Sequence, residues 1–283
     1  LSQLLDIPIV MWCADDFYIE PLKSSSFLRR FQCRRLLKLA QKAVEQAGAV
    51  ITISDMMQRD YAHLFHVPVK TIRISSAANH CALPTDSRSG VVYIGNLGIN
   101  RITPLSELGR ALKDAALAGF ETIHVYSGER NPEILQQINE KNGLIYCGCV
   151  SEQEVESVLG TSKFVIFTEA FDEKSICRTK YSLSTKIAES LQSGACILAY
   201  GPSEIASISY LTEAQAAYVL NEAKALPQAI LRLNAAPDVY DSYTRRARAL
   251  AERFHSAEAN EERLRDIIIE TAGRSAAITK HGG

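Results

Sequence analysis

Short apolar runs recur along the chain, and most are followed by a segment with the spacing of an amphipathic helix. Apolar runs of roughly four to eight residues, bounded by turn-forming residues, are typical of buried parallel strands. The runs that predict strands are 7–13, 49–54, 71–75, 91–95, 122–127, 144–147, 164–168, 195–200 and 217–220. Helical periodicity predicts helices at 55–65, 104–118, 132–139, 151–159 and 185–192. This alternation predicts an α/β fold with parallel sheets covered on both faces.

A polar, strand-free stretch between His80 and Gly90 interrupts the alternation and predicts a linker. We therefore expect two α/β domains, 1–86 and 87–240. A charged helical segment follows at 241–272, and the tail 273–283 has too little apolar surface to fold. The first strand comes within a few residues of Leu1. We expect the first domain to lack its opening strands.

Composition and charge argue against several classes of protein. The 283 residues include 31 Lys and Arg against 32 Asp and Glu, so no overall basic field points to nucleic acid. No apolar run approaches the ~20 residues of a membrane-spanning helix. The cysteines are scattered, and the Cys147-Gly-Cys149 spacing is not that of a zinc site. We expect a cytoplasmic protein with reduced thiols and without a metal.

The most informative stretch is 181–194, where a polar turn leads into a short predicted helix. Lys186 and Glu189 are three residues apart, so they lie on one helical face. A cation beside a carboxylate suits a ligand with a phosphate at one end and hydroxyls at the other, and a nucleotide sugar has that layout. The alternative is a surface ion pair between the two side chains, worth under about 1 kcal/mol.

Other polar residues follow predicted strands, where ligands of open α/β sheets bind. After strand 91–95, the backbone around Gly95 and Gly98 could cradle an anion, and Arg101 could bind phosphate bidentately. Gly128 after strand 122–127 would let a ligand approach the backbone. Plain turns are the alternative at both places.

Carboxylates follow two further strands. Glu169 or Asp172 could meet sugar hydroxyls, whereas we expect Glu173 to be solvated. Asp15 and Asp16 follow the first strand and could act as base or metal ligands, or cap a helix.

A basic amphipathic helix is predicted near Arg29–Lys38. Its basic residues Arg29, Arg30, Arg34, Arg35 and Lys38 alternate with Phe27, Leu28, Phe31, Leu36 and Leu37. One interpretation places the helix on anionic lipid, with the protein peripheral to the inner face of the membrane. The other is a domain-packing helix with a solvated basic face.

Four stretches together resemble the retaining, nucleotide-sugar-dependent glycosyltransferases of the GT-B fold, family 4 type. They are IPIV with DDF (7–17), AVITISDMM (49–57), VYIGNLGINR (92–101) and, most specifically, STKIAESLQSG (184–194). The resemblance runs from about residue 7 to residue 268. It implies two Rossmann-like domains that face a cleft, with the first shaping the acceptor site, the second binding the donor, and the last helix returning to the first.

The resemblance also implies a reaction. A sugar would pass from a nucleotide-diphosphate sugar to a glycan or lipid-linked acceptor with retention of configuration, without a metal or other cofactor. The implied catalytic residues are Lys186, Arg101 and Asp15. The implied donor-binding residues are Gly95, Asn96, Gly98, Arg101, Gly128, Tyr181, Ser182, Ser184, Thr185, Lys186 and Glu189.

Individual positions depart from the family pattern. Glu189 matches the second of two paired glutamates, which contacts the donor ribose, but Tyr181 stands where the first is expected. Asn96 and Arg101 stand where arginine and lysine are more usual. A histidine often found near Asp15 is missing. Two other classes therefore stay open: a non-catalytic GT-B partner subunit, which Tyr181 favours, and a sugar-nucleotide epimerase, which would need a carboxylate and a histidine at the cleft.

Overall fold

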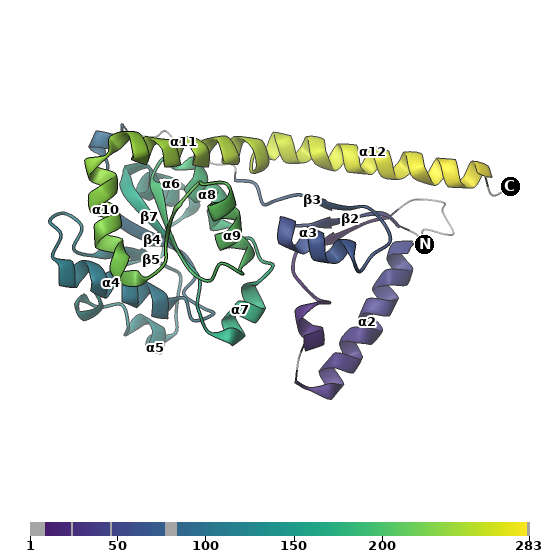
Figure 1. The fold of residues 1–283 in the computed structure, drawn as a ribbon, viewed down its shortest axis with the longest axis horizontal. Coiled ribbons are helices and arrows are strands. Elements are labelled where there is room, and N and C mark those ends of the chain that lie inside the picture. Colours follow the sequence, from purple (N-terminus) through teal and green to yellow (C-terminus); the bar gives the residue numbers. More distant parts are fainter. Residues whose placement is uncertain (1–8, 24, 46, 77–83, 282–283) are drawn as a thin grey trace. The chain divides into compact units, whose positions relative to one another are not determined.

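The structure, a computed structural model, describes residues 9–23, 25–45, 47–76 and 84–281. The chain divides into two compact α/β units (Figure 1). Unit 1 comprises Leu1–Ser75, Cys177–Leu183 and Phe254–Gly283, and unit 2 comprises Ser76–Ile176 and Ser184–Arg253. The predicted α/β class is confirmed. The division falls after Ser75 rather than after residue 86, and a short segment near residue 180 returns to unit 1.

The described residues of unit 1 form three parallel strands in the order β1-β2-β3, with bounds Ile9–Cys13, Ala47–Thr52 and Val69–Thr71. The first connection contains the 3-10 helix η1 (Glu20–Lys23) and α2 (Phe27–Glu45), and the second contains α3 (Asp55–Ala62). The N-terminus of α3 is capped by Ser54, whose side chain accepts a hydrogen bond from the Met57 N–H. Residues 7 and 8 of the first predicted strand lie outside the described residues.

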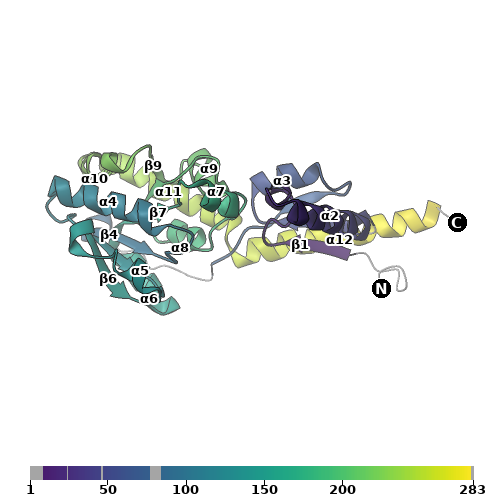
Figure 2. The same ribbon diagram turned by 90° about the horizontal axis from the view of Figure 1, so that it is seen from below.

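Both faces of this small sheet are covered. On one side, Val50 packs with Met57 and Tyr61 of α3 and with Val44 of α2. On the other side, α12 (Ala257–His281) runs along β1 and β2 (Figure 2). Its residue Ile267 packs against Ala49, Ile51 and Ile72.

The C-terminal helical region differs from the prediction. In place of one helix at 241–272 there are two, α11 (Pro237–Phe254) and α12. The break falls where His255 is buried and where the Ser256 hydroxyl caps α12 by accepting the Ala259 N–H at 3.1 Å. The expected disordered tail is also corrected: α12 continues to His281, through a stretch with two alanines, which favour helix. Residues 282–283 lie outside the described residues.

In the part of unit 2 that the structure describes there are six parallel strands, in the order β6-β5-β4-β7-β8-β9. Their bounds are β4 Ser89–Ile94, β5 Ile123–Tyr126, β6 Leu144–Gly148, β7 Ser162–Thr168, β8 Cys196–Tyr200 and β9 Tyr218–Leu220. The helices are η2 Thr85–Ser87, α4 Ile102–Ala115, α5 Pro132–Leu135, η3 Glu140–Asn142, α6 Glu152–Thr161, α7 Glu173–Thr179, α8 Lys186–Gln192, α9 Ala206–Glu213, η4 Ala223–Ala225 and α10 Leu226–Ala235. All strands predicted beyond residue 90 are present, with ends shifted by a few residues.

The central strands of unit 2 are apolar on both faces because helices cover both. Phe164 and Ile166 of β7 and Leu198 of β8 are buried in the core. Tyr240 of α11 joins this core, and its hydroxyl donates to the Lys163 carbonyl at 2.8 Å. α11 therefore belongs structurally to unit 2 up to Arg253.

Candidate functional site

The strand order of unit 2 places a ligand site between two particular strands. From β4 the chain proceeds outward through β5 and β6, and then β7 returns to the other side of β4. Such a reversal leaves a crevice at the carboxyl ends of the two central strands, where open α/β sheets bind ligands. Here the crevice lies between the loop 95–101 after β4 and Glu169 after β7.

The loop after β4 is shaped to receive Lys186. A Cβ added to Gly95 would lie 3.0 Å from Lys186 Cδ and 3.1 Å from Tyr93 Oη, so glycine lets the lysine stem cross the backbone there. The Tyr93 hydroxyl donates to the Asn96 carbonyl at 2.8 Å and holds the start of the loop.

The end of the same loop has an unusual backbone. Ile99 and Asn100 both have φ of 56°, a left-handed conformation that a β-branched residue rarely adopts. Asn100 is tied down on both sides of its amide: Nδ2 donates to Asp172 at 2.9 Å, and Oδ1 accepts from the Thr103 hydroxyl at 2.7 Å. Strained backbone that persists is held by its surroundings, and here it fixes the position of Arg101.

Arg101 forms a bidentate ion pair with Glu169. Its Nε and Nη2 each donate to a carboxylate oxygen at 3.0 Å. Burial raises the pKa of Glu169, and the charge of Arg101 opposes that shift. The sequence suggested that Glu169 could meet a sugar and that Arg101 could meet a phosphate. The structure instead joins the two side chains.

Lys186, the first residue of α8, lies beside this pair. Burial lowers the pKa of Lys186; the carboxylate of Glu189 opposes the shift, and the charge of Arg101 adds to it. Burial raises the pKa of Glu189, with Lys186 opposing and Glu152 adding. Among the ion pairs of the described residues, none joins Lys186 to Glu189. The surface-pair alternative therefore does not describe them.

Two cavities meet at Lys186. The larger, about 330 Å³, opens at the ends of β4, β5 and β6 and is lined by Ile94, Gly95, Asn96, Tyr126, Ser127, Gly128, Glu129, Cys149, Val150, Val155 and Lys186. The smaller, about 30 Å³, is lined by Tyr93, Ile94, Asn96, Arg101, Ile166, Phe167, Thr168, Glu169, Ser184, Lys186 and Ser190. The two spaces share Lys186, so a ligand in the larger one would lie beside this side chain.

The other expected donor residues are distributed unevenly. Gly98, Ser182, Thr185 and Glu189 line neither of these two cavities. Ser184 is anchored within unit 2, since its N–H donates to the Ser207 hydroxyl at 3.2 Å. Glu189 is half-buried on α8, one turn beyond Lys186.

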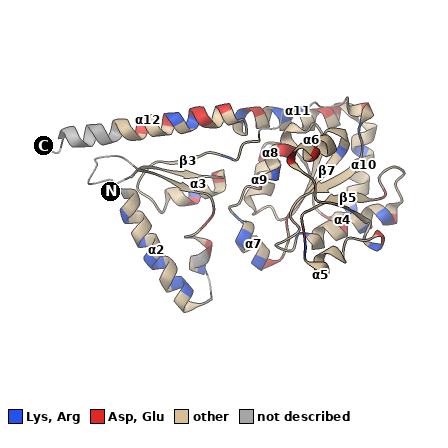
Figure 3. Cartoon of the chain, turned by 180° about the vertical axis from the view of Figure 1, so that it is seen from behind, with Lys and Arg blue, Asp and Glu red and all other residues tan. Residues whose placement is uncertain are grey.

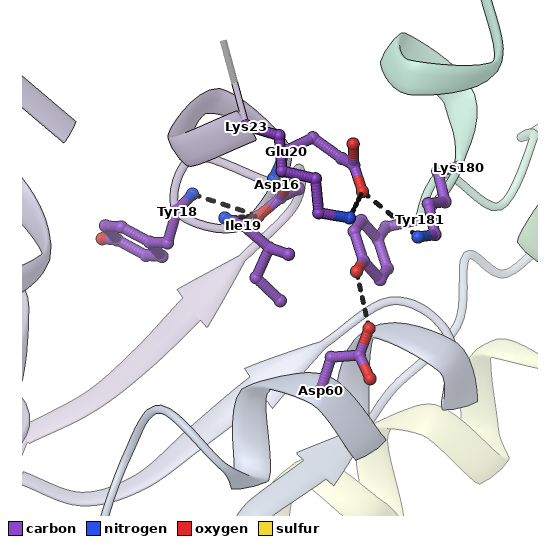
Figure 4. A network of polar contacts seen from close by, with 8 residues as sticks. All are labelled: Asp16, Tyr18, Ile19, Glu20, Lys23, Asp60, Lys180 and Tyr181. Carbon is purple, nitrogen blue, oxygen red and sulfur yellow. Dashed lines mark hydrogen bonds and ion pairs between the residues drawn. The ribbon is translucent and has the colours of Figure 1, made fainter. Parts of the chain in front are cut away.

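Tyr181 belongs to unit 1. It is buried in the core formed with Met57 and Tyr61, and its hydroxyl donates to Asp60 at 2.6 Å (Figure 4). Its carbonyl accepts the Ser54 hydroxyl at 2.8 Å. At the position where the resemblance implies a glutamate, the chain therefore has a tyrosine, and its hydroxyl already forms a hydrogen bond within unit 1.

The acidic pair after β1 has a clear division of roles. The Asp16 carboxylate accepts the N–H groups of Tyr18, Ile19 and Glu20 and the Tyr61 hydroxyl, so it caps η1 and its lead-in turn. The Asp15 side chain is exposed and, among the described residues, accepts only the neighbouring Asp16 N–H. Of the two acids, Asp15 is the one with a carboxylate open to solvent.

Glu169 is the site residue whose partner could not be inferred from the sequence. The available signal was a carboxylate directly after a strongly apolar strand. Pairing it with Arg101 required knowing that β4 and β7 are neighbours although β5 and β6 lie between them in the chain.

In the part of the chain that the structure describes, no group of His, Cys, Asp and Glu side chains is arranged to hold a metal ion. None of the helices found there is both long and apolar enough to span a bilayer.

Comparison with known proteins identifies the fold. The sequence matches no protein family and no curated protein. Among solved structures, WaaG, a glycosyltransferase involved in lipopolysaccharide biosynthesis, is 12% identical over 92% of this chain and 75% of its own, with a TM-score of 0.64. HepE of Anabaena, solved with UDP and glucose, is 15% identical over 94% and 72%, with a TM-score of 0.65.

TarM of S. aureus, solved with fondaparinux, α-GlcNAc-glycerol and UDP, is 17% identical over 92% of this chain, with a TM-score of 0.61. The chain spans 50% of TarM's length. Identities this low establish similarity of fold and not of substrate. The chain has the fold of GT-B glycosyltransferases, as the resemblance in its motifs implied.

Proposed function

We propose that the chain is part of a retaining glycosyltransferase that moves a sugar from a nucleotide-diphosphate sugar to a glycan or lipid-linked acceptor. One observation carries the proposal: two half-buried cations, Arg101 and Lys186, flank one small cavity at the switch point of a GT-B unit. A larger cavity adjoins it across Lys186 and would take the nucleoside. The neighbours solved with UDP support this choice of ligand class.

The chemistry of the site would be electrostatic. The leaving group of the reaction is a nucleoside diphosphate, which gains negative charge as the sugar departs. Lys186 and Arg101 would stabilise that charge from fixed positions, at a place shielded from water. Glu189 would accept hydrogen bonds from the ribose, and Gly95 and Gly128 would let the donor approach the backbone. No resident cofactor takes part in this scheme.

On the acceptor side, Asp15 is the proposed catalytic residue of unit 1. It follows β1 and keeps its carboxylate exposed, whereas the adjacent Asp16 is committed to local structure.

A non-catalytic GT-B partner subunit is the second candidate. Tyr181 favours it, because the family's first glutamate is replaced by a side chain buried within unit 1. A protein of this class would bind a nucleotide without releasing sugar from it.

The test is calorimetric titration with UDP, GDP and pyrophosphate, followed by assays of transfer and donor hydrolysis. We expect Lys186→Ala to weaken nucleoside-diphosphate binding about tenfold to a hundredfold, as for loss of a charged hydrogen bond. Glu189→Gln should weaken UDP or GDP binding more than pyrophosphate binding. Lys141→Ala, which removes an exposed lysine of η3, is the matched control.

The outcomes separate the candidates. Unchanged affinity in a folded Lys186→Ala protein would remove the phosphate role of Lys186, and the absence of any nucleotide binding would remove the proposed function. Binding without transfer or hydrolysis, with every plausible donor and acceptor, would favour the partner subunit.

We also propose that the protein is cytoplasmic and peripheral to the membrane, through α2. This helix exposes Phe27, Leu28 and Phe31 at 74%, 64% and 57%. Residues three and four apart share a helical face, so these three form one apolar patch. Basic residues run along the same helix, namely Arg29, Arg30, Arg34, Arg35, Lys38 and Lys42, and its one acid is Glu45 (Figure 3). Such a surface suits an anionic lipid headgroup layer.

A further inference from the structure

The Arg101–Glu169 pair raises a question that phosphate binding alone does not answer. A cation meant for an anionic ligand is held here by a carboxylate of the protein. Glu169 is only 2% exposed, and it directly follows the apolar strand β7. A buried carboxylate without a partner is strongly destabilising, so Glu169 needs the ion pair with Arg101. The same pair takes up two of the hydrogen-bond donors of Arg101.

The geometry of the pair fixes the guanidinium plane. Both carboxylate oxygens are used, each at 3.0 Å from a different nitrogen of Arg101. Because the guanidinium is rigid and planar, two such bonds define its orientation and leave its remaining N–H groups pointing in fixed directions. The ammonium group of a lysine at this position is not planar, so a carboxylate would not fix its orientation in the same way.

Arg101 and Glu169 are each also held in place by hydrogen bonds of the loops that carry them. The Glu169 N–H donates to the Tyr200 carbonyl at 3.1 Å, which extends the pairing of β7 with β8 by one residue. Arg101 follows the left-handed residues Ile99 and Asn100, and Asn100 is bonded to Asp172 in the loop after β7. The two loops are thus joined twice, once by Asn100 and once by Arg101.

Charge gives the pair a second role. Arg101 and Lys186 line the same small cavity, and the charge of Arg101 disfavours protonation of Lys186. Within the pair, the carboxylate of Glu169 balances the charge of Arg101 before any ligand arrives.

We propose that Glu169 is a positioning residue, which holds the Arg101 guanidinium in one orientation so that its remaining N–H groups meet the donor diphosphate. A phosphate that pulled Arg101 away would leave Glu169 buried and unpaired, so the pair persists when the donor is bound. The proposal rests on the proposed function, in which Arg101 and Lys186 bind that diphosphate.

The decisive variant is Glu169→Gln, because two effects of the change have opposite signs. Removing a negative charge beside two cations should, by Coulomb attraction alone, tighten binding of an anion. Loss of the bidentate bond should weaken it, because the glutamine amide nitrogen cannot accept from Arg101. We expect the second effect to win, with affinity for pyrophosphate, UDP and GDP falling about tenfold in calorimetry.

A double-mutant cycle separates positioning from general damage to the fold. In an Arg101→Gln background, Glu169→Gln should cause no further loss of pyrophosphate affinity, since there is no guanidinium left to orient. Affinity for uridine or guanosine, which carry no phosphate, should be unchanged by Glu169→Gln. Glu107→Gln is the matched control: this carboxylate of α4 accepts the Tyr200 hydroxyl at 3.2 Å and forms no ion pair with another described residue.

Each outcome decides something. If the wild-type protein binds neither pyrophosphate nor the nucleoside diphosphates, the proposed function fails and this proposal with it. If the wild type binds and Glu169→Gln binds pyrophosphate equally or more tightly, the positioning role is overturned while the function stands. An equal loss of nucleoside affinity would mean a structural role only. Should Glu169→Gln not fold, Glu169→Asp decides, because unchanged affinity in that shortened variant would contradict the proposal.

Discussion

At the scale of single residues, the sequence indicated which side chains carry charge at the site but not which of them meet. Lys186 was predicted from its place beside Glu189 on a short helix, and Arg101 from the loop after strand 91–95. The structure places both around one cavity. Their neighbour Glu169 was assigned to a sugar, because its true partner lies 68 positions away along the chain. Spacing along one helix is readable from a sequence, whereas contact between two loops depends on the strand order.

His255 provides a residue-scale prediction about stability. It lies at the break between α11 and α12, is fully buried, and its Nδ1 is 2.7 Å from the Ile74 carbonyl. Since a carbonyl only accepts, Nδ1 carries the hydrogen in the neutral ring. Burial lowers the pKa of His255 to about 4, the bond to Ile74 opposes this, and the charges of Arg73 and Arg263 add to it.

The lowered pKa of His255 determines how the stability of the folded chain changes with pH. Between about pH 6.5, where an unfolded histidine titrates, and about pH 4, the unfolded chain binds a proton that the folded chain does not. The contribution is complete above the unfolded pKa, and we expect unit 1 to lose about 3 kcal/mol of stability as the pH falls across this window. Urea unfolding followed by the fluorescence of Trp12, the single tryptophan, measures it.

The control for this effect is the difference between two variants. His255→Gln should flatten the dependence on pH, whereas His66→Gln, which changes an exposed histidine of unit 1, should leave it as in the wild type. If wild type and His255→Gln lose stability in parallel from pH 7 to pH 4, the assignment to His255 is wrong.

At the scale of elements, apolar runs located the central strands well, because strands such as β7 and β8 are buried on both faces and read as continuous hydrophobicity. Helix ends were harder. The segment 173–179 was not among the predicted helices, yet it forms α7, whose first turn is capped by Asp172 through the Ser175 N–H at 3.0 Å. Glu173 itself is exposed, as expected. The break at 255–256 was missed because charged helical periodicity continues across it. In both cases a local side-chain hydrogen bond caps the start of a helix, and the hydrophobic periodicity of the sequence does not show it.

The element-scale prediction concerns α2. We expect the whole chain to co-sediment with vesicles of phosphatidylserine and phosphatidylcholine, and far less with phosphatidylcholine alone, since each basic residue near an anionic surface contributes about 1 kcal/mol. Combined substitution of Phe27, Leu28 and Phe31 by Ser should reduce binding, and so should replacement of Arg34 and Arg35 by Glu.

The matched control changes exposed basic residues of unit 2, Arg130→Glu with Lys141→Glu, and should leave vesicle binding nearly unchanged. Equal binding of the wild type to neutral and anionic vesicles would contradict the electrostatic part of the proposal. Undiminished binding of the Ser variant would contradict the apolar part, and no binding at all would favour the alternative in which α2 packs against protein.

At the scale of the whole molecule, the two units differ in how far they depend on distant parts of the chain. Unit 1 is assembled from three separate segments, whereas the core of unit 2 is formed by its own strands and helices from Val91 to Tyr240. The sequence placed the donor domain at 87–240. The structure shows that this range would cut α11 at Tyr240, which is 1% exposed and packs on Phe164.

The last prediction follows from that difference. A fragment of residues 84–253 should fold by itself, because it retains all six strands of unit 2 and the whole of α11 within that unit. It should bind UDP, GDP or pyrophosphate with an affinity within about threefold of the full chain, which is under about 1 kcal/mol, and transfer no sugar. A fragment of 87–240 should unfold at a lower temperature, since it loses η2 and most of α11. Calorimetry and thermal unfolding of both fragments provide the check. If 84–253 folds but binds none of these ligands while the full chain does, residues of unit 1 are required for donor binding, and the site is not contained in unit 2.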